Sequence, residues 1–500
     1  MSEFNQCLLA TLGELADEPV EQTGPMSDFV YFDISSIDRA TKKITEPKLL
    51  TMSQAPSRAK QVLRAGDVLV SMTRPNLNAV ALVPEQFDGA IGSTGFHVLR
   101  SRWLHPEFLL RLVQSQRFVD EMSALVQGAL YPAVRPKDIA AFTFVFQTPA
   151  QQTRIVAKLE ELLSDLDAGV AELKAAQKKL AQYRQSLLKA AVEGALTADW
   201  RASHPPAETG AQLLDRILTE RRARWEAKQL AKFKEQGKAP PKDWQKKYPE
   251  PVQPDTTDLP ELPDGWVWAT LSQVGWLDRG RSKHRPRNAP HLYGGPYPFV
   301  QTGDIRHTDT FLSDVEASYS EAGLAQSRLW PAGTMCITIA ANIGKTAILS
   351  MEACFPDSVV GFLPASDEVS IRYVEYFMRS VQQKLEDEAP ATAQKNINLE
   401  ILEKVVIPVA PTLEQHEIVQ VLDDSMDAAR HSDRAIEFSL KQSSAQRQNI
   451  LRAAFSGQLV PQDPNDEPAS VLLERIRAER AARPTKTRKA KSATSRSTAC

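Results

Sequence analysis

The amino-acid sequence is written twice, and this internal repeat limits the possible folds more than any other feature. Residues 185–196 read QSLLKAAVEGAL, and residues 448–459 read QNILRAAFSGQL, at an offset of 263 positions. The same offset aligns 152–156 with 415–419. A period this long is incompatible with a solenoid of short repeats and indicates two copies of a composite module.

The match extends in both directions with small changes of offset. Residues 65–66 align with 332–333 at an offset of 267, and 213–217 align with 472–476 at an offset of 259. Two similar modules on one chain present two similar surfaces, and a pseudo-two-fold arrangement of this kind suits a target with two half-sites. A duplication without functional meaning is the alternative.

Each copy passes from a globule into a long helical region. In the first globule, 67–72 and 79–83 have strand composition, whereas 107–126 carry apolar residues at helical spacing. We therefore expect an α/β (α+β) fold. The expected segments are a first globule at 1–148, a helical region at 149–221, a basic, Pro-rich linker at 222–264, a second globule at 265–410, a second helical region at 411–483 and a disordered basic tail at 484–500.

The first helical region has the heptad spacing of a coiled coil, because its apolar residues recur at intervals of four and three. The a and d positions are Ile155, Leu159, Leu162, Leu166, Gly169, Leu173, Ala176, Leu180, Tyr183, Leu187 and Ala190. A helix of about 44 residues would be about 66 Å long. A helix buried in a globular bundle is the alternative.

The second helical region has a weaker seam. Its apolar positions are Ile418, Leu422, Ala429, Ile436, Ile450 and Ala453, and serines occupy several positions between them. We expect the two helices to pair in antiparallel orientation, because the chain must return its second globule to the far end of the first helix.

Charge balance restricts how this chain could bind a nucleic acid. Its 60 Lys and Arg residues meet 62 Asp and Glu residues, so the net charge is -2. Bulk electrostatic coating of DNA is excluded, and any contact must come from local basic patches. The clearest patch is the loop 279–287, which contains no acid. Its basic residues are Arg279, Arg281, Lys283, Arg285 and Arg287.

Arginine makes bidentate contacts with guanine and also binds phosphate, so this loop is a candidate DNA-binding element. Two further loops, 73–78 and 340–345, are related by the repeat, and a third candidate spans 394–396. The side chains they offer are Arg74, Asn76, Asn78, Asn342, Lys345, Gln394 and Lys395. A solvated loop without DNA contact is the alternative at each place.

Residues 211–250 form another charged segment, with eleven Lys and Arg residues against six Asp and Glu residues. Trp225, Trp244 and Tyr248 lie among these charges. The composition predicts either a surface for a partner or for the DNA backbone, or a solvated helix followed by a linker.

No convincing catalytic motif is present in the sequence. Residues 341–346 resemble the end of a phosphate-binding loop, but Ile339 stands where that motif requires glycine. Pro356-Asp357 could open a nuclease motif, yet no Asp/Glu-x-Lys follows at a usable distance. No adenine-methyltransferase tetrapeptide and no HExxH occurs. The four cysteines form no CxxC pair, so we expect no metal site and a cytoplasmic protein.

The ends of both helical regions resemble the specificity subunits of type I restriction–modification systems. The starts at 149–156 and 411–419 and the ends at 188–197 and 451–460 carry this resemblance. Residues 128–139 and 391–402 also resemble the close of the family's target-recognition domains. The likeness covers nearly the whole chain, although the second helix has a poor seam and 222–255 add a basic extension.

The resemblance implies two target-recognition domains, each reading one half of a bipartite site in double-stranded DNA. It implies a coiled coil that sets the spacer and docks two methyltransferase subunits, with restriction subunits joining the complex. Methylation, ATP hydrolysis and cleavage would lie on these partners, which use S-adenosylmethionine, ATP and Mg. The chain itself would be non-catalytic and without a cofactor. A coiled-coil scaffold that binds proteins but not DNA is the alternative.

Overall fold

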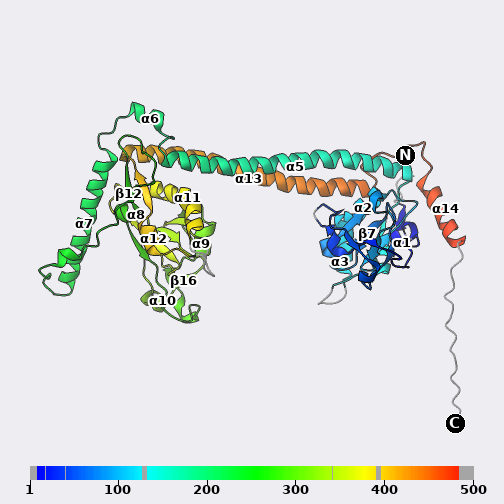
Figure 1. Cartoon of the computed structure of the whole chain (residues 1–500), viewed down its shortest axis with the longest axis horizontal. Helices are drawn as coiled ribbons and strands as arrows, with labels where there is room; N and C mark the ends of the chain where they lie inside the picture. The colour runs from blue at the N-terminus through cyan, green and yellow to red at the C-terminus, as the bar shows by residue number, and fades with distance from the viewer. Residues whose placement is uncertain are drawn as a thin grey trace, which may run out of the picture. The chain divides into compact units, whose positions relative to one another are not determined.

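The computed structural model describes residues 8–16, 18–39, 41–126, 132–340, 342–389 and 396–482. The chain divides into two compact units. Unit 1 comprises residues 1–174 and 436–500, and unit 2 comprises residues 175–435. Each unit contains one globule and parts of the two long helices α5 (Pro149–Val192) and α13 (Thr412–Phe455) (Figure 1). The predicted tail at 484–500, like Gln394 and Lys395, lies outside the described residues.

The globule of unit 1 is built from small β-sheets covered by short helices. A three-stranded sheet has the order β10-β7-β8, and a four-stranded sheet has the order β5-β2-β9-β6. The strands are β1 (Leu9–Thr11), β2 (Phe29–Phe32), β3 (Ile37–Asp38), β4 (Lys43–Ile44), β5 (Lys48–Leu50), β6 (Ala59–Val62), β7 (Val68–Ser71), β8 (Val80–Leu82), β9 (Ile91–Ser93), β10 (Phe96–Leu99) and β11 (Thr143–Val145). The helices are α1 (Leu12–Leu15), α2 (Pro106–Gln114), α3 (Gln116–Ala124), α4 (Pro136–Ala140) and α14 (Ala469–Ala482).

The predicted helical pattern over 107–126 is interrupted at Ser115. This residue has extended backbone angles, φ -62° and ψ 145°, and its hydroxyl accepts a hydrogen bond from the Phe118 backbone N–H at 3.4 Å. A serine that caps the next helix competes with continuation of the previous one. The helical spacing over 107–126 therefore belongs to two consecutive helices, α2 and α3.

The globule of unit 2 centres on a five-stranded sheet of order β13-β19-β17-β18-β15. The strands of the unit are β12 (Val267–Thr270), β13 (Gly275–Arg279), β14 (Tyr293–Pro298), β15 (Phe311–Leu312), β16 (Ser318–Tyr319), β17 (Met335–Thr338), β18 (Thr346–Leu349), β19 (Val359–Pro364) and β20 (Val406–Val409). Its other helices are α6 (Ala198–Ser203), α7 (Gly210–Glu235), α8 (Leu271–Val274), α9 (Thr302–His307), α10 (Glu321–Ala325), α11 (Ile371–Glu388) and α12 (Leu399–Glu403).

The two units repeat the same local construction, which fits the repeat predicted from the sequence. β1 pairs antiparallel with β11 in unit 1, and β12 pairs antiparallel with β20 in unit 2. A short helix follows β1 and β12, and each opens with a capping box, Thr11 with Glu14 and Thr270 with Gln273. A capping box satisfies two backbone N–H groups at a helix start, so the same sequence signature produces the same turn twice.

The long helices pair in antiparallel orientation within each unit. In unit 1, Asp167 of α5 forms an ion pair with Arg447 of α13. In unit 2, Arg184 Nη1 lies 2.5 Å from Asp433 Oδ2, and Leu188 shares a buried cluster with residues near the start of α13. Positions later in α5 thus meet positions earlier in α13. The predicted α/β fold with an antiparallel coiled coil is confirmed.

The buried positions of α5 depart from the strict heptad spacing that the sequence predicts. Most of the predicted apolar seam positions are buried or half-buried, namely Ile155, Leu159, Leu162, Leu166, Leu173, Leu180, Leu187, Ile418, Leu422, Ile436 and Ile450. However, Ala176 and Tyr183 are exposed, and half-buried Gln177 and Arg184 take their places. A straight helix has 3.6 residues per turn and drifts by about 20° per heptad, so a strict 3.5-residue pattern fails toward its middle.

In each unit, one further helix packs against the core. Leu213 and Ile217 of α7 are buried in the core of unit 2, and Leu472 and Ile476 of α14 are buried in the core of unit 1. Burial of such side chains is worth about 1.5–3 kcal/mol each. α7 then continues without a break to Glu235, past the predicted segment boundary at 221/222.

Candidate nucleic-acid interface

Two of the candidate loops of unit 2 leave the five-stranded sheet where its strands end, on the same side. We call this border of strand ends the edge of the sheet, and the loops there its edge loops. β13 and β17 flank β19, where Arg279 pairs with Val360 and Thr338 pairs with Val359. The loops 280–287 and 339–345 therefore begin at neighbouring points of this edge. Both hydrogen-bond to the segment just before β19. The Arg281 N–H donates to the Phe355 carbonyl at 3.0 Å, and the Ile339 N–H donates to the Ser358 carbonyl at 3.0 Å.

Asp357 holds two arginines of the basic loop. Arg287 Nη2 donates to both carboxylate oxygens of Asp357 at 2.8 Å, and Arg279 Nη2 and Nε donate to its backbone carbonyl at 2.6 and 3.0 Å. Arg285 Nη1 donates to the backbone carbonyls of residues 282 and 284 at 2.7 and 2.9 Å. The sequence marked Pro356-Asp357 as a possible nuclease start. The contacts instead make Asp357 an organiser of the basic loop.

The other two basic side chains of this loop make fewer contacts with the rest of the protein. Lys283 is exposed and has no carboxylate partner within the described part of the chain. Arg281 is exposed as well, and its Nη2 lies 3.9 Å from Asp278 Oδ2. That carboxylate also accepts a hydrogen bond from Arg328 at 2.6 Å. Lys283 and Arg281 are therefore the side chains of the loop best placed to meet a polyanion.

The first residues of the loop 340–345 pair with the last residue of the third candidate, Asn396, and its neighbour. Ala340 forms an isolated antiparallel bridge with Asn396, and the Ile397 N–H donates to the Ile339 carbonyl at 3.0 Å. Asn342 is exposed, with φ 78°, and Lys345 is half-buried. The structure thus brings residues 339–340 and 396–397 together, although the sequence predicted the loops to which they belong separately.

Unit 1 repeats this arrangement at its own edge. Thr73 bridges antiparallel to Ala133, and the Arg74 N–H donates to the Pro132 carbonyl at 2.8 Å. Arg74 and Asn76 are exposed. The repeat relates Thr73 to Ala340 and Ala133 to Asn396, so equivalent loops meet in both units.

Asn78 is held inside the loop rather than presented by it. Its Nδ2 donates to the Val113 carbonyl at 3.1 Å, and its backbone carbonyl accepts from Lys42 Nζ at 2.5 Å. Its predicted role in reading bases therefore has no support from these contacts. Lys42, which the sequence reasoning missed, lies beside this edge. Burial, with the nearby Arg39, lowers the pKa of Lys42. In the sequence, the only indication of Lys42 is the group of basic residues that begins at Arg39.

Non-glycine residues with left-handed backbone conformation lie on or beside these loops. Among the described residues, the non-glycine residues with positive φ are Lys42, Arg74, Asn78 and Asn342. A left-handed conformation costs such residues about 1–2 kcal/mol each. Strain of this kind persists where the surroundings hold it in place, and it is concentrated at functional sites.

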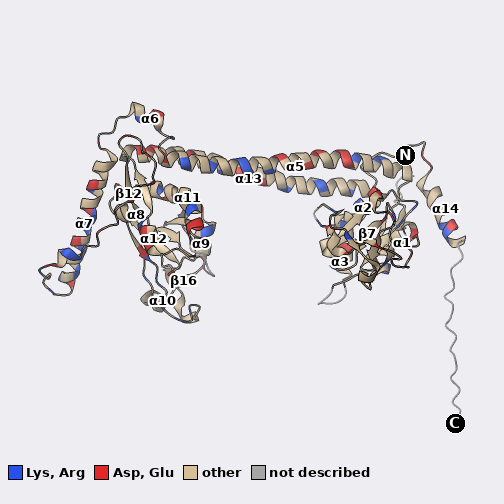
Figure 2. Ribbon diagram, viewed as in Figure 1, with Lys and Arg blue, Asp and Glu red and all other residues tan. Residues whose placement is uncertain are grey.

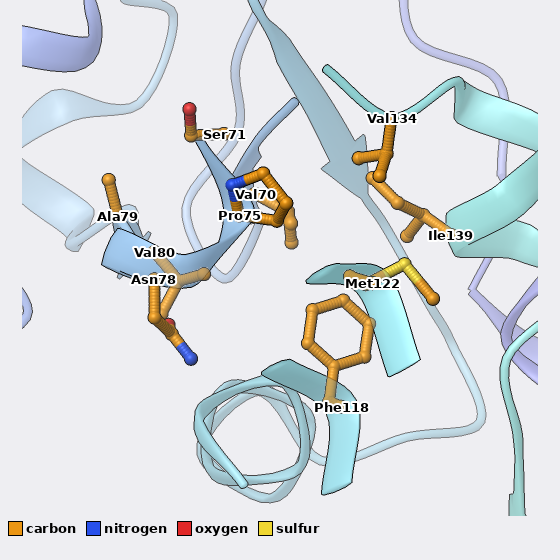
Figure 3. A pocket seen from close by; sticks show the side chains of 10 residues that line it. All are labelled: Val70, Ser71, Pro75, Asn78, Ala79, Val80, Phe118, Met122, Val134 and Ile139. Atoms are coloured by element: carbon orange, nitrogen blue, oxygen red, sulfur yellow. The ribbon is translucent and has the colours of Figure 1, made fainter. Parts of the chain in front are cut away.

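The loop of unit 1 rests on apolar packing. Pro75 faces Phe118 and Met122 from α3 and Val134 and Ile139 from the region of α4 (Figure 3). The cavity between these side chains measures about 10 Å³. Small-molecule sites occupy several hundred Å³, so this place supports a loop and does not bind a substrate.

The described residues contain no arrangement that resembles a catalytic centre. Cys336 is fully buried, and burial raises the pKa of its thiol, which makes it a poor nucleophile. Glu375 is buried, but Arg372, Arg379 and Thr346 occupy its carboxylate. Within the described ranges, no three His, Cys, Asp or Glu side chains are grouped to hold a metal ion, and no helix is long and apolar enough to cross a membrane.

Comparison with known proteins gives a consistent result. Residues 263–435 match the family model described as type I restriction modification DNA specificity domain. The specificity subunit of the type I restriction enzyme EcoDI from Escherichia coli is 24% identical over 400 residues, covering 77% of this chain and 79% of that protein. The HindI specificity subunit from Haemophilus influenzae is 22% identical over 437 residues, covering 81% and 90%.

Solved structures agree with these relatives. A chain from a study of complex assembly and conformational transition of the type I restriction–modification system has a TM-score of 0.69 and 26% identity, covering 90% of this chain and 98% of that one. The HsdS subunit from Thermoanaerobacter tengcongensis has a TM-score of 0.56 and 26% identity, covering 92% and 100%.

The duplicated α/β module and the long helix pair are therefore a fold that this chain shares with solved type I specificity subunits. Over most of its length the chain is similar to the specificity subunits of type I restriction–modification systems, and residues 263–435 match their DNA specificity domain.

Proposed function

We propose that each globule reads one half of a bipartite DNA site through the loops at its sheet edge. The observation that carries this proposal is the recurrence of one loop arrangement in both units, at Thr73–Ala133 and at Ala340–Asn396. In unit 2 the loop 279–287 adds Arg281 and Lys283 to that edge. Because the loops of the two units differ in sequence, the two half-sites should differ as well.

In this proposal the paired helices set the spacer between the half-sites. α5 and α13 each contain 44 residues. A helix of that size is about 66 Å long, nearly two turns of DNA. The seam needs only side-chain packing and ion pairs such as Arg184–Asp433, so its length can vary without changes to the edge loops.

The partners in this proposal are double-stranded DNA, two methyltransferase subunits docked on the helical regions, and restriction subunits, assembled in the cytoplasm. Adenine methylation, ATP hydrolysis and cleavage belong to those partners, together with S-adenosylmethionine, ATP and Mg. The chain acts as the non-catalytic specificity subunit. The names of its relatives, which are specificity subunits of type I restriction enzymes, support this division of labour.

The decisive experiment is to co-purify the chain with its cognate methyltransferase subunit and to map the adenines that the complex modifies. We expect methylation at one bipartite motif with two different halves and a constant spacer. Methylation without a bipartite motif would contradict the proposal. A protein scaffold that does not bind DNA, the second candidate, would assemble the complex but leave its DNA affinity insensitive to salt and to Arg281→Ala.

A further inference from the structure

The segment 221–250 has a basic surface that lies outside the edge loops. It contains ten Lys and Arg residues and four Asp and Glu residues, in a chain with a net charge of -2. The segment runs along the C-terminal part of α7 and returns through a short 3-10 helix, η5 (Trp244–Lys247). We call it the α7 hairpin.

The base of the α7 hairpin is anchored to the globule of unit 2. Arg221 is 4% exposed, and its guanidinium lies 3.7 Å from the ring centroid of Trp276, the second residue of β13. Arg221 Nη1 also donates to the Tyr248 hydroxyl at 2.5 Å and to the Pro249 carbonyl at 3.1 Å. The hairpin is therefore tied to the strand that ends in the basic edge loop.

An aromatic cluster holds the return segment on α7. The rings of Trp225 and Trp244 stack with centroids 5.8 Å apart and an interplanar angle of 18°. Tyr248 packs edge-on against Trp225, and Phe233 packs edge-on against Trp244. Because these rings pack on one another, they give the hairpin its shape and are not available as a platform for stacked bases.

The cations of the hairpin fall into two groups. Arg222 and Arg224 are paired with carboxylates: Arg222 lies 3.3 Å from Glu226, and Arg224 lies 3.1 Å from Asp367. Several lysines are instead exposed and have no carboxylate partner in the part of the chain that the structure describes: Lys228, Lys232, Lys234, Lys238, Lys242 and Lys247. Unpaired ammonium groups bind phosphates as point charges, without reading sequence.

The hairpin points toward the end of unit 2 at which the basic loop emerges. From Arg221 to Glu235, α7 extends by about 21 Å. In Figure 1 it runs away from α5 and α13 and ends at the same end of the unit as α10. The loop 280–287 contacts this end, because the His284 N–H donates to Oε1 of Gln326, the residue after α10, at 3.0 Å. Figure 2 shows Lys and Arg along this part of α7.

We propose that the α7 hairpin binds the phosphate backbone of the DNA that flanks the half-site read by unit 2. The inference rests on the proposed function, which places DNA at the adjoining edge loops. The sequence supports it independently, because the second copy also turns basic after its matching helix, at 483–491.

The test uses the complex of this chain with its methyltransferase subunits and a Lys232→Gln/Lys234→Gln variant. The matched control, Lys60→Gln/Lys404→Gln, removes the same charge from exposed positions outside the candidate loops, the α7 hairpin and the long helices. DNA affinity is measured between 50 and 200 mM salt, values at which screening differs strongly. Three duplexes are compared: the bipartite site alone, the site extended by about one helical turn beyond the unit 2 half, and the site extended equally beyond the other half.

We expect the unmodified complex to bind the duplex extended at the unit 2 half more tightly than the bare site. The hairpin variant should lose most of that gain, and its salt slope should fall by about 0.9 for each phosphate contact removed. The control should behave like the unmodified complex. Affinity for the bare site should change little in either variant.

Unchanged affinity and salt slope on the extended duplex would overturn the proposal. So would weaker subunit assembly, measured by molecular mass, with DNA binding intact, because the lysines would then meet an acidic protein surface. Failure of the proposed function is distinguishable. In that case the unmodified complex would not discriminate the specific duplex from one with scrambled half-sites, whatever the hairpin does.

Discussion

At the residue scale, the basic loop of unit 2 divides into side chains that build the loop and side chains that can bind. Asp357 anchors both Arg279 and Arg287, through its backbone carbonyl and its carboxylate respectively, so both side chains are held by the protein and the charge of Arg287 is partly neutralised. Lys283 has no carboxylate partner among the described residues, and it projects from the same loop. The sequence showed the cluster of cations, but an acid about 70 positions away decides how they are used.

We expect Lys283→Gln to weaken DNA binding of the assembled complex with a lower salt slope, by about 0.9 if one phosphate contact is lost. The half-site sequence should stay the same, because a single ammonium contacts phosphate without reading a base. Binding titrations at several salt concentrations, with Lys404→Gln as a control of equal charge change, measure this. An unchanged slope would show that Lys283 does not meet the backbone.

A second residue-scale feature is the buried carboxylate of Glu414 at the start of α13. It is 2% exposed and accepts hydrogen bonds from Thr197 Oγ1 at 2.7 Å, Arg201 Nε at 2.8 Å and Trp266 Nε1 at 2.8 Å. The repeat places Gln151 at the equivalent position of unit 1. The sequence aligned these two residues but could not show that one of them joins three segments of the chain.

Glu414→Ala should destabilise unit 2 by about 3–5 kcal/mol, because it leaves a guanidinium and two further donors without their acceptor. Glu414→Gln should cost less, since an amide oxygen can still accept one of these hydrogen bonds. Urea denaturation followed by circular dichroism compares the two variants. Equal and small losses would mean that solvent replaces the carboxylate without cost.

At the scale of elements, α5 and α13 combine a short apolar seam with ion pairs. Heptad spacing was sufficient to predict the pairing, but it misplaced Ala176 and Tyr183, because a straight helix does not keep a strict seven-residue period. The middle of the pair is only half-buried. Its length therefore depends on the number of residues more than on any single contact.

Insertion of one heptad into both helices adds about 10.5 Å, or about 3 base pairs of rise. We expect the methylated motif to keep both half-sites and to gain about that many base pairs in its spacer. Mapping of modified adenines in cells that express the variant measures both quantities. Altered half-sites with a constant spacer would contradict the assignment of these two tasks to separate elements.

The contact between α14 and the first globule depends on a titrating group. Burial raises the pKa of Glu14, but hydrogen bonds from Arg477 and Thr11 outweigh this effect and hold it below its ordinary value. Arg477 Nε lies 2.9 Å from Glu14 Oε1. A lowered pKa means that the stabilisation is complete above the ordinary value of 4.5 and is lost as the pH falls through the folded pKa.

Hydrogen exchange of the α14 amides should therefore accelerate between neutral pH and pH values below the 4.5 of an ordinary glutamate, beyond the intrinsic pH effect on exchange. In Glu14→Gln the helix should already be loose at neutral pH, and the extra acid dependence should disappear. Arg480→Gln, whose native Nη1 donates to the Glu14 backbone carbonyl, should weaken α14 but keep the acid dependence. Identical profiles for Glu14→Gln and the native chain would contradict this role.

At the scale of the whole molecule, duplication is the organising principle. Each unit has its own core, its own terminal helix and its own edge loops. The same backbone bridge recurs at both edges although the side chains there differ. Under the proposed function, a protein built in this way can change the recognition of one half-site without disturbing the other.

The sequence by itself determined the repeat, the fold class, the antiparallel helix pair and the identity of the candidate loops. These depend on periodic patterns and on local signals such as capping boxes, which are short-range and survive divergence. Only the tertiary structure decided that Asp357 holds Arg279 and Arg287 and that the Asn78 side chain donates a hydrogen bond to the Val113 carbonyl. It also decided that Ala340 and Asn396 lie together. Those outcomes depend on strand order, which brings distant segments to one sheet edge and leaves no local trace in the sequence.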